Sequence, residues 1–475
     1  MSFSDILTMR HELMLTVLAL VVLIIDLNLH NRDKHYIIPI AIFLFFIHAV
    51  AGFMPSQAIE LFGGMYRTNA LLVMMKNILN IGVLIILLQS VTWLKKDENR
   101  EKISEYFILL FSTLIGMNFM ISSGDFLMFY LGLELATIPI AALAAYTHHQ
   151  TKSAEAGIKL ILSSALSSGI LLFGISLVYG STGTIYFDTV MQQYANSPMQ
   201  VLAFIFFFTG MSFKLSLVPF HLWTADVYEG APINVTSYLS VISKGAAAFI
   251  LIIVMFTVFN KIAPVYNHIL YFIAVLTMTI GNLFALRQKN MKRFLAFSSI
   301  AQAGFILLGI LGGNTLGMTS VIYFVLVYIF SNLGAFGVVS AIETVTGKNS
   351  MDDYDGLYAT NPKLSLLMML ALFSLAGIPP VAGFFGKFFL FASAASAGYY
   401  WLVFIAVLNA TISLYYYLLV VKAMFINKNE TPLAYFKSDL ATRAGLVLSG
   451  LGIFILGFWS QIYELINNLS FGILR

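Results

Sequence analysis

Long runs of apolar residues, separated by short polar stretches, follow one another along almost the whole chain from Leu13 onward. Each run has about 20 residues, the length of helix that crosses a hydrocarbon core roughly 30 Å thick. Charged residues, proline and glycine break the runs, so the pattern predicts an all-α polytopic membrane protein of about fourteen transmembrane helices. We place these helices at 13–30, 36–54, 70–93, 104–122, 125–146, 157–180, 200–223, 232–258, 266–286, 294–312, 319–342, 364–396, 400–425 and 441–465.

The composition agrees with this pattern. Of the 475 residues, 59% are hydrophobic and 10% are charged, far fewer charges than water-soluble domains carry. The chain has no cysteine, which excludes disulfides, cysteine-bound iron–sulfur clusters and thiol catalysis within it. The first apolar run has no small-residue cleavage site after it, so we expect it to stay in the protein as a helix rather than act as a signal peptide.

The basic residues are distributed unevenly between the two sides of the membrane. Loops that follow odd-numbered helices carry 17 of the 26 lysines and arginines, and the opposite side carries four, Arg10, Arg67, Lys261 and Arg475. Because basic loops stay in the cytoplasm, this asymmetry predicts a multi-pass protein of the cell inner (plasma) membrane with both termini on the outer, periplasmic side.

The remaining five cations lie inside predicted helices, as does one acid, Glu134 of the fifth helix. The five are Lys76, Lys159, Lys214, Lys244 and Lys387. A charge at the centre of a membrane helix costs about 2.5–3.5 kcal/mol, so such residues usually serve a function. Lysine suits proton transfer because burial favours its neutral form and a nearby carboxylate favours its charged form. We therefore interpret Glu134, Lys214, Lys244 and Lys387 as a proton path.

Each of these residues also has a structural interpretation. Glu134 and one lysine could form a static ion pair that locks two helices together. Lys76 lies near the outer end of its helix and could extend its amine to the membrane surface. Lys159 follows Glu155 by four residues, which favours a local ion pair.

Proline interrupts two of the helices, and each of these helices carries a lysine near the break. The seventh contains Lys214 before Pro219, and the twelfth contains Pro379 and Pro380 before Lys387. Proline frees backbone carbonyls, which inside a membrane must face protein or water. Helices five apart cross in opposite directions, as an inverted repeat of helices 4–8 and 9–13 requires. Ordinary proline kinks are the alternative interpretation.

The histidines and glycines give no sign of a metal or nucleotide site. His221, at the end of the seventh helix and the predicted cytoplasmic rim, is a possible proton relay or a capped interfacial histidine. His48 stands alone on an apolar helix and is predicted to be structural. The histidines have no metal-ligand spacing, and no glycine-rich phosphate loop follows a strand.

Two segments resemble the antiporter-like membrane subunits of respiratory complex I, a family similar to this chain over nearly its whole length. The first runs from Phe213 to Trp223 and continues through Asp226–Pro232 to Val235–Lys244; the second is Gly377–Lys387. The resemblance implies that Glu134, Lys214, Lys244 and Lys387 form a polar proton path, and it makes Lys159 a plausible channel residue. Lys387 differs from the glutamate usual in sister subunit M, and the chain lacks the long lateral helix of subunit L.

The resemblance also implies a domain organisation. Residues 1–103 would form three N-terminal helices, 104–258 the first five-helix repeat, 259–425 the second, inverted repeat, and 426–475 the last helix.

The implied function is proton translocation within an NADH-quinone oxidoreductase, driven by electron transfer from NADH to quinone. FMN, iron–sulfur clusters and quinone would bind to partner subunits, with no cofactor or metal in this chain, and other membrane subunits, including sister antiporter-like subunits, would be its partners. Nucleic acid is not expected as a partner. Two alternatives remain: a subunit of an Mrp-type cation/proton antiporter, and a non-conducting membrane scaffold whose buried charges only pair.

Overall fold

A computed structural model describes residues 3–195, 197–430 and 432–470, and these residues form an almost entirely helical protein. The helices are α1 (Phe3–Ile6), α2 (Arg10–Asn28), α3 (Ile37–Ala51), α4 (Ala70–Leu94), α5 (Ile103–Ile121), α6 (Phe126–Ala144), α7 (Thr151–Thr182), α8 (Phe187–Gln193), α9 (Pro198–Leu215), α10 (Leu222–Gly230), α11 (Ile233–Tyr238), α12 (Lys244–Thr257), α13 (Ala263–Ala285), α14 (Met291–Leu311), α15 (Thr315–Thr346), α16 (Leu357–Thr360), α17 (Pro362–Ala376), α18 (Ala382–Ser396), α19 (Tyr400–Phe425), α20 (Leu440–Phe458) and α21 (Gln461–Ser470).

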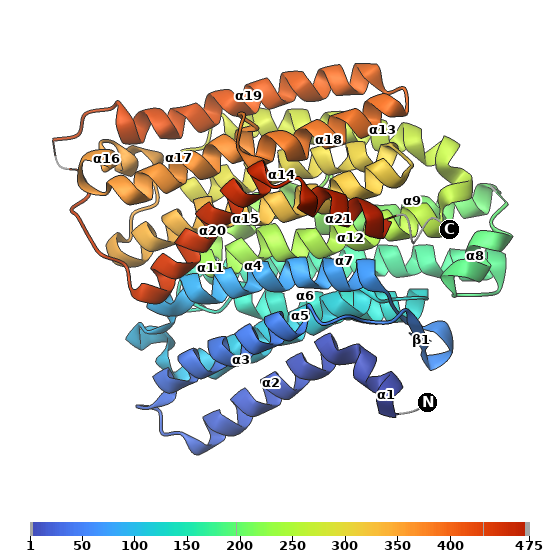
Figure 1. The fold of residues 1–475 in the computed structure, drawn as a ribbon, viewed down its shortest axis with the longest axis horizontal. Coiled ribbons are helices and arrows are strands. Elements are labelled where there is room, and N and C mark those ends of the chain that lie inside the picture. The colour runs from blue at the N-terminus through green and yellow to red at the C-terminus, as the bar shows by residue number, and fades with distance from the viewer. Residues whose placement is uncertain (1–2, 196, 431, 471–475) are drawn as a thin grey trace.

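The long helices lie side by side with their axes nearly parallel, as a membrane-spanning bundle requires (Figure 1). Among the described residues, thirteen helical segments are long and apolar enough to cross a membrane. The predicted span 364–396 is divided into two shorter helices, α17 and α18. The predicted all-α polytopic class is therefore confirmed.

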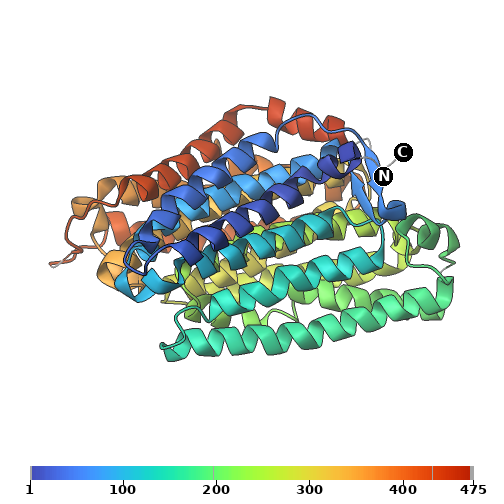
Figure 2. The same cartoon turned by 90° about the horizontal axis from the view of Figure 1, so that it is seen from below.

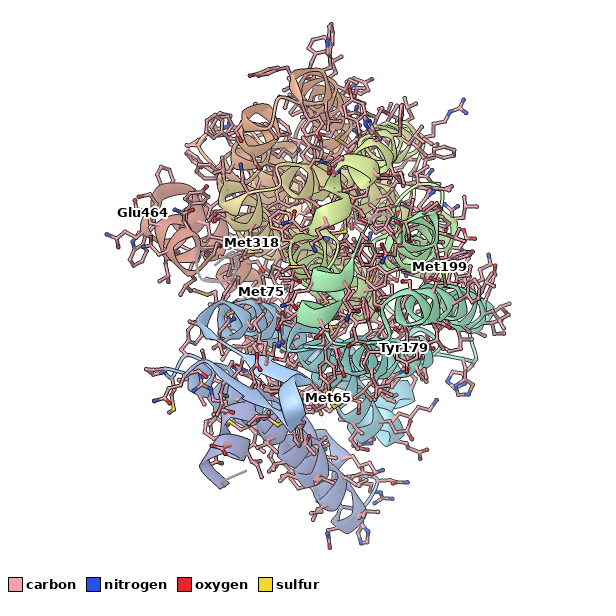
Figure 3. All side chains as sticks on the ribbon, turned by 90° about the vertical axis from the view of Figure 1, so that its right-hand side faces the viewer. Met65, Met75, Tyr179, Met199, Met318 and Glu464 are labelled. Atoms are coloured by element: carbon pink, nitrogen blue, oxygen red, sulfur yellow. The ribbon has the colours of Figure 1, made fainter. Side chains whose placement is uncertain are left out.

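Both ends of the chain lie at the same end of the bundle, which we call the termini end (Figure 1). Seen from that end, the helices are viewed almost along their axes (Figure 3). Met75 and Met318, near the starts of α4 and α15, and Tyr179, near the close of α7, all lie there. Successive helices therefore alternate in direction.

A short β-hairpin at the termini end has no counterpart in the predicted elements. Its strands are β1 (Ile59–Leu61) and β2 (Tyr66–Thr68), antiparallel, with Glu60 opposite Arg67. Arg67 connects the hairpin to α8 by an ion pair with Asp188, in which Nη2 of Arg67 lies 2.5 Å from Oδ2 of Asp188. Three-residue strands are too short to leave a periodic signal in the sequence.

Segments far apart in the sequence close the bundle. In Figure 2 the C-terminal α20 lies alongside the N-terminal helices, and it packs directly on α4. Thr92 of α4 donates a hydrogen bond of 2.5 Å to Asp439, which caps the start of α20. The interior is formed by the segments Ile233–Thr257 and Met291–Leu311, which are buried except at Thr257 and Arg293, and by most of α15. Helices that are predominantly apolar on every face are typical of the core of a large protein.

Candidate proton-transfer site

The first broken helix places Lys214 at an irregular turn inside the bundle. Helix α9 ends at Leu215 because Ser216 adopts a left-handed conformation (φ +63°), and α10 begins at Leu222. The indole nitrogen of Trp223 donates to the carbonyl of Phe213 at 3.1 Å, which satisfies one backbone group freed by the break. The predicted helix 200–223 therefore ends earlier than its apolar pattern suggested, and the lysine lies in its last turn.

In the second broken helix, the side chain of Lys387 caps the end of the first half-helix. Helix α17 ends at Ala376, because Gly377 after it adopts a left-handed conformation (φ +89°), and α18 begins at Ala382. The Lys387 ammonium donates to the carbonyl oxygens of Leu375 and Ala376 at 2.8 and 3.0 Å. These carbonyls form the negative end of the α17 dipole, so the break itself supplies partial negative charge to Lys387, which has no carboxylate within 4.0 Å among the described residues.

Close packing of the two half-helices fixes this geometry. A Cβ added to Gly383, at the start of α18, would lie 1.7 Å from the carbonyl oxygen of Ser374 in α17. We expect Gly383→Ala to separate the half-helices and to reduce the yield of assembled protein severalfold, measured by quantitative immunoblotting of membranes. Gly169→Ala in α7 is the control, because nothing lies within 4 Å of the added atom. Equal yields of the two variants would contradict the proposed packing constraint.

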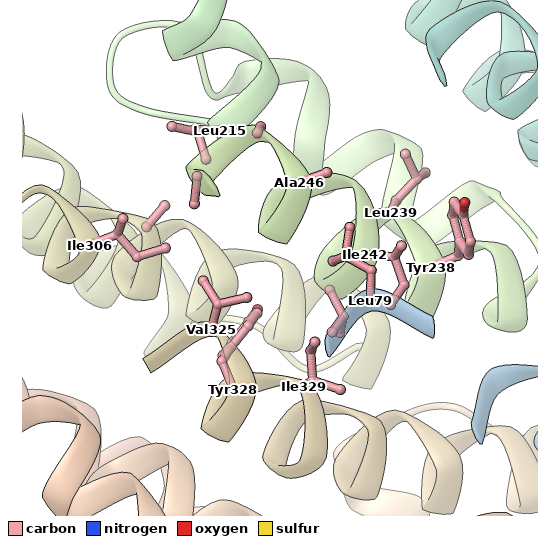
Figure 4. Close-up of a cluster of buried hydrophobic side chains, with 14 of the residues drawn as sticks. Leu79, Leu215, Tyr238, Leu239, Ile242, Ala246, Ile306, Val325, Tyr328 and Ile329 are labelled. Atoms are coloured by element: carbon pink, nitrogen blue, oxygen red, sulfur yellow. The ribbon is translucent and has the colours of Figure 1, made fainter. Parts of the chain in front are cut away.

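Lys244 lies at the centre of the protein, directly after a segment of π-helix, Leu239–Ser243, that joins α11 to α12. π-Turns inside α-helices frequently mark functional sites. Its ammonium donates to Ser299 Oγ at 2.7 Å and lies 5.4 Å from the centre of the Tyr228 ring. Apolar side chains of neighbouring helices, among them Leu79 of α4, Ile306 of α14 and Val325 of α15, lie around this segment (Figure 4).

Lys214 and Glu134 are neighbours without being in contact. Lys214 donates to Thr137 Oγ1 of α6 at 2.7 Å, and Thr137 lies one turn beyond Glu134 in the same helix. Among the described residues Glu134 has no basic partner within 4.0 Å, so the static ion pair is absent, and its buried Oε1 accepts no hydrogen bond. A carboxylate close to a lysine but not bonded to it can change that lysine's charge through a small movement.

Three cavities of about 10 Å³ adjoin the buried lysines. One is lined by Lys214 and Thr137, one by Lys244 and Ser299, and one by Lys387 and Ser374. The second and third share Gln302 and Tyr328 as wall residues. This volume is at the lower limit for one water molecule, and polar walls are the setting in which buried water is found.

Hydrogen-bonding side chains connect the space between Lys244 and Lys387. Gln302 donates to the carbonyl of Leu375, one of the two groups that bind Lys387, at 3.0 Å. Tyr328 hydrogen-bonds Ser240 of the π-segment at 3.1 Å. Sequence reasoning missed Thr137, Gln302 and Tyr328; the signal that could have revealed Gln302 is a lone amide in an apolar helix.

His221 lies inside the protein rather than at its rim. The residue is 7% exposed, its Nδ1 is buried without a hydrogen-bond partner, and its ring is within electrostatic range of the Lys244 ammonium. The interfacial interpretation is therefore wrong, because the break after α9 folds the chain back into the bundle. His221 lies between Lys214 and Lys244 in the sequence and close to Lys244 in space. This position suits a proton relay.

Lys159 joins a charged network at the end of the bundle opposite the termini. It contacts Glu155 at 2.6 Å, as the local spacing predicts, and also Asp226 of α10 at 2.7 Å. Arg293 of α14 binds the same Asp226 at 2.7 Å and Glu229 at 3.1 Å. The network connects α7, α10 and α14, and it leaves Lys159 outside the buried line of lysines.

The network should weaken in acid. Burial raises the pKa of Asp226, but hydrogen bonds from Lys159 and Arg293 outweigh it and hold that pKa below its ordinary value. A carboxylate whose pKa is lower in the folded state stabilises the fold above its unfolded pKa and loses that effect as pH falls through the folded value. We expect Asp226→Asn to lower thermal stability at pH 7 and to approach wild type as the pH falls through the lowered pKa of Asp226. A difference independent of pH would contradict this.

A larger polar cavity of about 330 Å³ opens at the same end of the bundle. Its walls come from the ends of α4, α10 and α15 and the starts of α7 and α14. Lys292 faces it and contacts Glu343 at 3.2 Å, and Lys292 also donates to the carbonyl of Ala231 at 3.3 Å. Water can therefore approach the junction of α10 and α11 from this end.

The last intramembrane lysine, Lys76, does not extend to the surface. It is fully buried and contacts Glu12 of α2 at 2.5 Å, and Tyr66 of the hairpin donates to the same carboxylate at 3.1 Å. The expected surface exposure is therefore wrong, because the first apolar run begins with a buried acid that the hairpin covers. His48 is also buried here, its ring 5.7 Å from that of His11.

No described residues form a group of three or more histidines, cysteines, aspartates or glutamates that could bind a metal. Fold and site together define a membrane-spanning, antiporter-like subunit. Residues 123–413 match the family model described as NADH:quinone oxidoreductase/Mrp antiporter, TM.

Two relatives are similar in sequence to this chain over nearly its full length. An NADH-quinone oxidoreductase subunit N from Phocaeicola vulgatus is 52% identical, covering 99% of this chain and 100% of the relative. A subunit N from Azobacteroides pseudotrichonymphae is 49% identical over the whole of both chains. The chain belongs to the NADH-quinone oxidoreductase subunit N family, the proton-translocating, antiporter-like membrane subunits of respiratory complex I. The predicted resemblance is confirmed.

Solved structures show the same fold. A chain of respiratory complex I from Thermus thermophilus superposes with a TM-score of 0.80 at 27% identity, covering 95% of this chain and 98% of the other. A chain of the Mrp complex from a Dietzia species gives a TM-score of 0.85 at 20% identity, covering 99% and 98%. The second similarity concerns the fold alone.

Proposed function

We propose that this subunit moves protons through Glu134, Lys214, Lys244 and Lys387, driven by electron transfer from NADH to quinone in partner subunits. The observation that carries the proposal is the set of three lysines, each at most 8% exposed, bound only to neutral oxygens. A lysine fixed by a carboxylate would hold its proton, whereas one bound to hydroxyls or carbonyls can release it.

In this mechanism Glu134 sets the charge of Lys214. When the carboxylate approaches, it stabilises the ammonium; when it moves away, Lys214 passes its proton towards Lys244, with His221 as a possible relay. Gln302, Tyr328 and the water-sized cavities then lead from Lys244 to Lys387. Lys387 exchanges its proton with the outer side.

We further propose fourteen crossings, with α17 and α18 forming one broken crossing beside the thirteen long segments. The common location of both chain ends supports this count, because it requires an even number of crossings (Figure 1). The two breaks, one in α9–α10 and one in α17–α18, support an inverted repeat of residues 104–258 and 259–425, flanked by 1–103 and 426–475.

The basic loops support an orientation in which the termini end faces outward across the cell inner membrane. The 330 Å³ cavity would then open to the cytoplasm and supply protons to the path. Iron–sulfur clusters would reside in partner subunits, since this chain has no cysteine to bind them, and FMN and quinone would bind to partner subunits as well. Sister antiporter-like subunits would adjoin it in the membrane.

Proton uptake into vesicles during NADH oxidation tests the proposal. In assembled complex carrying Lys244→Met, we expect fewer protons moved per NADH oxidised, because the central group that accepts the proton is gone. Lys422→Met, an exposed lysine near the end of α19, is the control and should pump as wild type does. Normal pumping by Lys244→Met would favour the scaffold alternative.

A further inference from the structure

A cleft of about 830 Å³ lies at the end of the bundle opposite the termini, away from the buried lysines. The start of α17, the start of α20 and the segment 435–438 before α20 form its walls. None of the residues proposed for the proton path lines this cleft.

Three cations line this cleft: Lys363, Lys437 and Arg443. All three are exposed, and among the described residues none of them has an acidic partner within 4.0 Å. The nearby Asp439 accepts hydrogen bonds from Thr92 and from the backbone of Thr442, and among the described residues it forms no ion pair within 4.0 Å with any of the three cations. The cleft therefore gathers three cations that have no ion-pair partner among the described residues.

The rest of the cleft is apolar. Leu364 and Leu367 of α17 face Leu446 and Val447 of α20, and Tyr435 at the mouth is 71% exposed. Aromatic residues at such a level are typical of the membrane interface. The lining is thus cationic near the helix ends and apolar further along the helices. An anionic phospholipid has the complementary order, with a charged headgroup followed by apolar acyl chains.

Hydrogen bonds hold the cleft open without a ligand. Asn361, at the start of α17, donates to the carbonyl of Ala434 at 3.2 Å, and its side-chain oxygen accepts from the backbone of Phe436 at 3.4 Å. The contact of Thr92 with Asp439 anchors the other side of the segment. A preformed site loses less entropy on binding than one that must order itself.

From this charge complementarity we infer that the cleft binds an anionic phospholipid of the cytoplasmic leaflet. Its phosphate would lie among Lys363, Lys437 and Arg443, and its acyl chains would follow the apolar groove between α17 and α20. Basic pockets between transmembrane helices on the cytoplasmic side bind such headgroups. The inference uses the proposed orientation only to name the leaflet, and it does not depend on proton transfer.

Lipid analysis of the intact complex tests the inference. After exchange into a non-ionic detergent, wild-type complex should retain at least one more cardiolipin or phosphatidylglycerol per complex than the variant Lys363→Gln, Lys437→Gln, Arg443→Gln. The control replaces three exposed cations outside the cleft, Lys95, Arg287 and Lys428, with glutamine and should keep the wild-type amount. Equal retention in all three complexes would overturn the inference.

A crosslinking experiment distinguishes a lipid from a neighbouring protein. A photoreactive phenylalanine analogue in place of Tyr435 should label anionic phospholipid in the assembled complex, and added phosphatidylglycerol, but not phosphatidylcholine, should increase that labelling after delipidation. A crosslink to another subunit instead would overturn the inference, since it would show that protein covers the cleft.

Discussion

Assembled complex carrying Lys214→Met in this subunit should transfer protons through it at least about a hundredfold more slowly than wild type. Without the amine, a proton would have to enter the apolar interior alone, at a cost of about 3 kcal/mol or more, and each 1.36 kcal/mol slows a step tenfold. Proton uptake per NADH oxidised, measured in vesicles with a pH-sensitive dye, should fall accordingly. Glu134→Gln should lower it as well, because the amide cannot change the charge of Lys214.

Two further variants separate a conducting role from a structural one. Thr137→Val removes the hydroxyl that binds Lys214 but keeps the lysine. We expect proton uptake per NADH oxidised to lie between that of wild type and that of Lys214→Met. Lys261→Met alters an exposed lysine outside the bundle core and should have no effect. If Lys214→Met assembles normally and pumps as wild type does, Lys214 is not part of the path.

Glu12→Gln should destabilise the subunit by about 3–5 kcal/mol, the typical cost of leaving one member of a buried ion pair unpaired. Lys76 is fully buried, and Glu12 is its only acidic partner among the described residues. The loss should appear in thermal unfolding of the purified complex as earlier release of this subunit. Tyr66→Phe, which removes only hydrogen bonds to the pair, should cost about 1 kcal/mol.

The double variant Glu12→Gln, Lys76→Met provides the internal control. Replacing both charges with neutral groups removes the desolvation cost as well as the attraction, so stability should return close to that of wild type. A double variant as unstable as Glu12→Gln would show that packing, rather than the unpaired charge, causes the loss. Proton pumping by the double variant should be normal, because this pair lies outside the proposed path.

The sequence by itself determined the class of fold and the residues worth testing. Hydrophobic length is a local property, so the thirteen long spans and the divided region 364–396 could be located without tertiary information. Charges in apolar helices are visible for the same reason. Lys214, Lys244 and Lys387 stood out because each is costly where it lies, and all three are buried in the structure.

Only the tertiary structure decided which partners those charges have. Glu12 precedes the first apolar run, and nothing in the sequence pattern connects it with Lys76, yet in the folded protein it is the ion-pair partner of that lysine. Glu134 looked like a possible partner of Lys214, yet Thr137 holds that amine. Asp226 gains Arg293 from a helix 67 residues away. Ion pairs, water-sized cavities and clefts depend on distances between helices, and hydrophobic periodicity carries no information about those distances.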